Sequence, residues 1–192
     1  MIKLSKDENI VKAFFESFRL GVDLFDEVER QAGRNPDFKV SLQDDGFFFF
    51  CEVKSLNTEV TNDGLLHSRV FNIYTAGIHD SFGQFKVVNS QHFVPNVLAY
   101  VSHNFQMNSH NFKDFLQGYI SIPNGDEKES VMPLRKVSSS NHIKELEKID
   151  LILFFLGDKP DYIITSKDQR FINKLIRIFG IKEEDISRLS LG

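Results

Sequence analysis

The sequence predicts a mixed α/β fold, in which helices flank a β-sheet, and three observations lead to this prediction. Apolar residues recur at helical spacing near the N-terminus. Two strand-like runs, 38–42 and 47–54, then flank the turn-forming sequence Asp44-Asp45-Gly46. A long helical pattern over about 64–86 comes next, and further strands follow it. A hairpin, a crossover helix and a further strand together predict a sheet with both antiparallel and parallel pairs.

The first helix is predicted from its apolar stripe, and it lasts about three turns before Gly21. The stripe consists of Ile10, Val11, Phe14, Phe15 and Phe18. Ser5 followed by Glu8 is a capping-box pattern, in which the two side chains bind backbone N–H groups at the start of the helix.

The hairpin predicts which side chains meet across it. A turn centred near Asp44 and Asp45 pairs residues whose numbers sum to about 89 or 90, so Asp37 lies roughly opposite Glu52. Strand side chains alternate between faces, so Lys54 shares a face with Glu52 and Asp37. The other face is apolar and consists of Phe38, Val40, Leu42, Phe47, Phe49, Cys51 and Val53. The four consecutive phenylalanines of 47–50 indicate a central strand that is buried on both faces.

The second half of the chain continues the α/β pattern. We expect a strand over 92–101, with Pro95 near its start or at an edge, and a short helix over 109–117. The stretch 123–141 is rich in Pro, Gly, Ser and charge, and we expect a flexible loop there. A second hairpin follows over 149–165.

A final helix is predicted from Ser166, as its N-cap, to Gly180. Its basic residues Arg170, Lys174 and Arg177 share one face. That face could track phosphates or could be an ordinary solvated face.

Composition indicates one domain over residues 1–192, long enough to bury a core without metals or disulfides. Cys51 is the only cysteine, which excludes an internal disulfide and suits a reducing compartment. We see no signal peptide and no membrane-spanning run, so we expect a cytoplasmic protein. The net charge of −4 is not the overall charge typical of a DNA-binding protein, so contacts to nucleic acid would need a local basic strip.

The convergence of Asp37, Glu52 and Lys54 suits a hard divalent cation and a phosphate oxygen. These residues resemble the PD-(D/E)xK nuclease superfamily, which includes restriction-endonuclease-like and Holliday-junction-resolvase-like phosphodiesterases. Pro36-Asp37 matches the first half of its motif and Glu52-Val53-Lys54 matches the second, and the resemblance is tightest over residues 8–54. It implies a restriction-endonuclease-like mixed sheet flanked by helices.

The resemblance also implies roles for these residues. Asp37, Glu52 and the Val53 carbonyl would bind Mg²⁺, for which Mn²⁺ could substitute, and Lys54 would orient or activate the attacking water. An acid from the first helix usually joins such a site, and Glu8 is our first candidate, with Glu16 second. The crossover helix often adds a Gln or His. Gln84 is our choice there, ahead of His79 and Lys86, although it could be a plain surface residue.

We therefore expect a metal-dependent endonuclease that hydrolyses DNA phosphodiester bonds, and a homodimer if it cuts both strands of a duplex. The main alternative is a non-catalytic module of this fold that binds nucleic acid or protein. A third interpretation is a hydrolase of small phosphorylated molecules. Five histidines lie between positions 67 and 110, but their spacing is not that of a zinc site.

Overall fold

A seven-stranded sheet forms the centre of the structure, which is a computed structural model. The structure describes residues 3–26, 35–42, 46–57, 66–105, 107–117, 119–123, 129–133, 144–165 and 168–188. In spatial order its strands are β1 (Leu20–Leu24), β2 (Phe38–Leu42), β3 (Phe48–Leu56), β4 (Asn96–Ser102), β7 (Leu151–Phe155), β8 (Pro160–Ile164) and β9 (Ile186–Arg188). The strands β5 (Tyr119–Pro123) and β6 (Glu129–Pro133) pair separately. The helices are α1 (Lys6–Ser17), α3 (Leu66–Val88), α4 (Ser109–Gln117) and α6 (Gln169–Phe179), followed by a short 3₁₀ helix, η1 (Glu183–Asp185).

The sheet is mixed, as the sequence predicts. Strand β2 is antiparallel to both β1 and β3, whereas β3, β4 and β7 run parallel to one another. Two parallel neighbours need a crossover connection, and α3 provides it between β3 and β4. At the other edge, β8 is antiparallel to β7 and parallel to β9.

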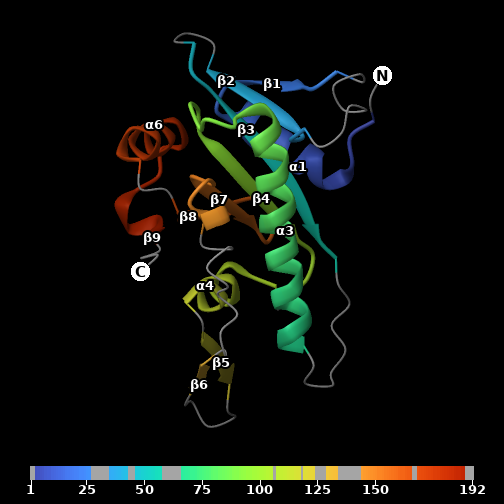
Figure 1. Cartoon of the computed structure of the whole chain (residues 1–192), viewed down its shortest axis with the longest axis vertical. Helices are drawn as coiled ribbons and strands as arrows, with labels where there is room; N and C mark the ends of the chain where they lie inside the picture. The colour runs from blue at the N-terminus through green and yellow to red at the C-terminus, as the bar shows by residue number, and fades with distance from the viewer. Residues whose placement is uncertain are drawn as a thin grey trace.

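Helices cover both faces of the sheet. One apolar core contains residues of α1 and α6, such as Phe15 and Leu175, and the other contains residues of α3 and α4, such as Tyr74 and Phe112. Figure 1 shows the long α3 in front of the sheet, with α6 on the left of the view. All seven residues of β4 are buried, because its side chains alternate between these two cores.

The structure confirms several predicted elements and corrects others. The strand 38–42 and the helix 109–117 have their predicted bounds, and the second hairpin is present as β7 and β8. The last helix is capped by Asp168, not by Ser166, because the Asp168 side chain accepts a hydrogen bond from the Arg170 N–H. Gly180 ends that helix in the left-handed region, as predicted.

Three further differences concern strands. Strand β4 begins at Asn96, not at position 92, because His92 has a φ of 54° and Pro95 precedes the strand. The stretch 123–141, expected to be a loop, contains the last residue of β5 and all of β6. Its residues 124–128 and 134–141 lie outside the described residues. The strands β1 and β9, which are short edge strands, were not predicted from the sequence. No helix in the described part of the chain combines the length and the apolarity that crossing a bilayer requires.

Candidate functional site

The register of the first hairpin places Asp37 beside Glu52. Phe38 pairs with Cys51 and Val40 pairs with Phe49, so Asp37, one residue before β2, comes opposite Glu52 on β3. Asp37 is held there because its Oδ2 accepts a hydrogen bond of 2.8 Å from the Val53 N–H. The paired residue numbers sum to 89, within the range that the sequence predicts.

Glu52 and Lys54 lie on the face of β3 that is turned toward α3. The apolar residues of the opposite face belong to the core that includes α1, as the alternation predicts. Lys54 Nζ is 2.8 Å from Glu52 Oε1, and Glu52 is only 3% exposed. The structure therefore brings together the three residues on which the motif depends.

Burial raises the pKa of both carboxyl groups of this pair. It raises the pKa of Glu52 to about 8, and the negative charge of Asp37 contributes to that rise while Lys54 opposes it. Burial likewise raises the pKa of Asp37 to about 6; the Val53 N–H opposes this rise and the charge of Glu8 adds to it. Near neutral pH the pair therefore retains a proton, which a divalent cation can displace.

Glu8 serves the helix cap and also influences the site. The capping box is present, because the Glu8 N–H donates to Ser5 Oγ at 3.1 Å and the Ser5 N–H donates to Glu8 Oε2 at 2.5 Å. The charge of Glu8 also acts on Asp37, so this acid lies near the carboxyl pair. Glu16, the second candidate, instead forms an ion pair with Lys12 on an exposed part of α1. Of the two candidate acids, Glu8 is therefore the one whose charge acts on Asp37.

Gln84 connects α3 to the same place. Its Nε2 donates to the Asn35 carbonyl at 3.4 Å, and its side chain also interacts with Glu52. Lys86, the other polar group considered on this helix, is exposed. A cavity of about 300 Å³ opens beside Lys54 and Gln84, and its remaining lining residues are His79, Asp80 and Gly83. The described residues therefore surround a small cavity with the predicted lysine and glutamine on its wall.

Three oxygen groups of this cluster could hold a hard cation. Glu52 Oε2 is buried and accepts no hydrogen bond from the described residues. In a strand the N–H and C=O of one residue point to the same edge, so the Val53 carbonyl points to the edge where Asp37 lies. No group of three His, Cys, Asp or Glu side chains suited to a metal occurs among the described residues. With Asp37, these groups would give a cation few protein ligands, as is usual for Mg²⁺, which keeps several waters.

A second polar cluster lies on the opposite face of β3, and no sequence pattern predicts it. Asp7 is 5% exposed, its Oδ1 is 2.8 Å from His103 Nε2, and its other oxygen accepts a hydrogen bond from Ser55 Oγ. An acid in the first helical turn is ordinary, so nothing in the sequence distinguishes Asp7. Only its partners, 48 and 96 residues away, indicate its role in holding α1 against β3 and β4.

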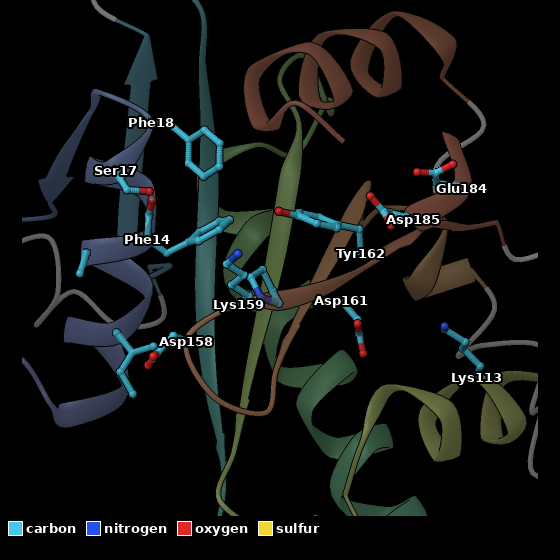
Figure 2. A pocket seen from close by; sticks show the side chains of 13 residues that line it. Phe14, Ser17, Phe18, Lys113, Asp158, Lys159, Asp161, Tyr162, Glu184 and Asp185 are labelled. Atoms are coloured by element: carbon cyan, nitrogen blue, oxygen red, sulfur yellow. Dashed lines mark hydrogen bonds between the residues drawn. The ribbon is translucent and has the colours of Figure 1, made fainter. Parts of the chain in front are cut away.

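A larger cavity of about 980 Å³ lies elsewhere, between α1, β8 and η1. Figure 2 shows Phe14 and Phe18 of α1 on one side of it and Tyr162 of β8 facing them. It contains none of the predicted site residues. Four carboxylates and two lysines line it: Asp158, Asp161, Glu184 and Asp185, and Lys113 and Lys159. This excess of carboxylates disfavours a phosphate backbone, so the smaller cavity is the better candidate for phosphate chemistry.

Comparison with known proteins gives no match: no family model, no curated protein and no solved structure matches this chain.

Proposed function

We propose that this protein is a Mg²⁺-dependent nuclease that hydrolyses DNA phosphodiester bonds, and that its sheet is a restriction-endonuclease-like core. The observation that carries the proposal is the buried carboxyl pair of Asp37 and Glu52 with Lys54, which lies 2.8 Å from Glu52 and lines a cavity. The order of elements supports the fold, because the β2–β3 hairpin is followed by the α3 crossover and the parallel strand β4.

The residues divide the chemistry between them. Asp37, Glu52 and the Val53 carbonyl hold the cation, which when bound lowers the pKa of a water and neutralises charge on the phosphate. Lys54 is fixed by Glu52, so its ammonium group provides positive charge where negative charge develops during in-line attack. Gln84 holds the segment before Asp37 in place through the Asn35 carbonyl.

The test is cleavage of supercoiled plasmid, a single strand and a four-way junction by the purified protein with Mg²⁺ or Mn²⁺. Lys54→Ala is compared with Lys86→Ala, which removes an exposed lysine that does not line the cavity. We expect metal-dependent cutting by the wild type and by Lys86→Ala but not by Lys54→Ala. Equal cutting by Lys54→Ala and the wild type would refute the assignment, as would full activity of Asp37→Ala.

A further inference from the structure

We propose that His79, held by Glu145, is a binding position for a second phosphate of the substrate strand, next to the phosphate that is attacked. This inference rests on the proposed nuclease function and adds a subsite to it. It would mean that the enzyme recognises at least two consecutive phosphates of one strand.

The first support is the way the His79 ring is fixed. Its Nδ1 is 2.7 Å from Glu145 Oε1, and Glu145 is a buried residue on the segment before β7, 66 positions along the chain. A carboxylate that accepts from one ring nitrogen fixes the orientation of the imidazole. The other ring nitrogen, Nε2, is then the atom presented to a ligand, and an N–H there donates to a phosphate oxygen.

The second support is the position of the ring. His79 lines the same cavity as Lys54 and Gln84, yet its side chain is 67% exposed, so a ligand can reach it. Because the side chains of Lys54 and His79 line one cavity of about 300 Å³, a strand whose attacked phosphate lies at Lys54 places a neighbouring phosphate within reach of His79.

The other polar residues that line the cavity offer a second phosphate little. Lys54 is already paired with Glu52, and Asp80 is an exposed carboxylate on the same wall as His79, which would repel an anion. His79 Nε2 therefore gives the second phosphate a specific hydrogen-bond partner.

The test uses two short oligonucleotides as probes, TpT with one phosphate and TpTpT with two. Their dissociation constants are measured by NMR titration with Ca²⁺ in place of Mg²⁺ to prevent cutting. We expect the wild type to bind TpTpT about 10-fold more tightly than TpT. His79→Ala should lose this advantage and still bind TpT like the wild type. The amide spectrum of each variant reports directly whether it is folded.

Two controls separate contact with phosphate from a structural effect. His110→Ala removes a histidine of similar exposure, 64%, which also has a carboxylate neighbour but does not line the cavity, and it should retain the advantage. TpTpT with either phosphate replaced by a neutral methylphosphonate should bind the wild type and His79→Ala equally. A structural role of His79 would instead weaken the binding of every probe.

The outcomes also separate this inference from the proposed function. If the wild type cuts DNA and His79→Ala keeps its preference for TpTpT, the His79 subsite is refuted and the nuclease assignment stands. If the wild type binds both probes as expected but cuts nothing, the subsite stands and catalysis is refuted. Absence of both binding and cutting would refute both proposals.

Discussion

The substitution Glu52→Gln should make the metal-free protein more stable at alkaline pH. A glutamine has nearly the shape of glutamate and can still accept a hydrogen bond from Lys54, but it carries no charge to bury. Because Glu52 is 3% exposed and its pKa is raised from the ordinary 4.5 to about 8, the ionised carboxylate disfavours the folded state. Such a cost is expected where a residue serves function at the expense of stability.

The sign follows from proton binding. Between the ordinary pKa of glutamate and the raised pKa of Glu52, the folded protein holds a proton that the unfolded chain has lost, so the free energy of unfolding falls as pH rises. At ~1.4 kcal/mol per pH unit, the full shift corresponds to about 4–5 kcal/mol above pH 8. Part of this shift comes from Asp37, and Lys54 loses an ion pair in the variant. We therefore expect Glu52→Gln to gain about 2 kcal/mol at pH 8.5 and about zero at pH 4.5.

The assay is urea denaturation of both proteins at these two pH values, with EDTA and then with Mg²⁺. Glu16→Gln is the matched control, because Glu16 is half exposed and paired with Lys12 outside the site. Mg²⁺ should stabilise the wild type and leave Glu52→Gln unchanged, since binding to the folded state alone stabilises it. Equal stability of wild type and Glu52→Gln at pH 8.5 without metal would refute the reasoning, and so would destabilisation of the variant there.

Three other predictions concern metal, catalysis and packing. The affinity for Mg²⁺ should rise as pH increases from about 5 to 9, because the pKa values of Asp37 and Glu52 are about 6 and 8 and metal binding releases their protons. Calorimetry in two buffers of different ionisation enthalpy measures the affinity and the number of protons released. A pH-independent affinity would contradict the prediction. Lys54→Ala should lower the rate of single-turnover cleavage by roughly 10²–10³-fold with little change in DNA affinity. An equal loss of cleavage rate and DNA affinity would indicate a binding role for Lys54 instead. Gly77→Ala should destabilise the fold by about 1–3 kcal/mol in thermal melts, since its Cβ would lie 2.6 Å from the hydroxyl of the buried Tyr100. Gly83→Ala, whose Cβ would meet nothing within 4 Å, should be neutral or stabilising, and equal losses for both glycines would refute the packing argument.

The resemblance to PD-(D/E)xK nucleases identified residues that the fold does bring together. Asp37, Glu52, Lys54 and Gln84 come from three separate segments and meet around Glu52, in the middle of β3. Of the two candidate acids of the first helix, Glu8 acts on Asp37, whereas Glu16 is paired with Lys12. Whether this arrangement cuts DNA is the question that the cleavage assay answers.

The sequence by itself determined the features that depend on neighbouring residues. A two-residue period and a short turn fix the register of β2 and β3, so the meeting of Asp37, Glu52 and Lys54 is predictable. The capping box of Ser5 and Glu8 is equally local. The Ser166 cap was wrong because two competing N-cap residues, Ser166 and Asp168, lie within one turn, and local rules alone do not choose between them.

Only the tertiary structure decided how these local pieces become a site. It brings His79 to Glu145 and Asp7 to His103, pairs that are 66 and 96 residues apart and share no sequence pattern. It also decided the raised pKa values of Asp37 and Glu52, because these depend on how fully the packed chain removes the two carboxyl groups from water. Periodicity specifies the face on which a side chain lies, but burial and long-range partners arise only when the helices close over the sheet.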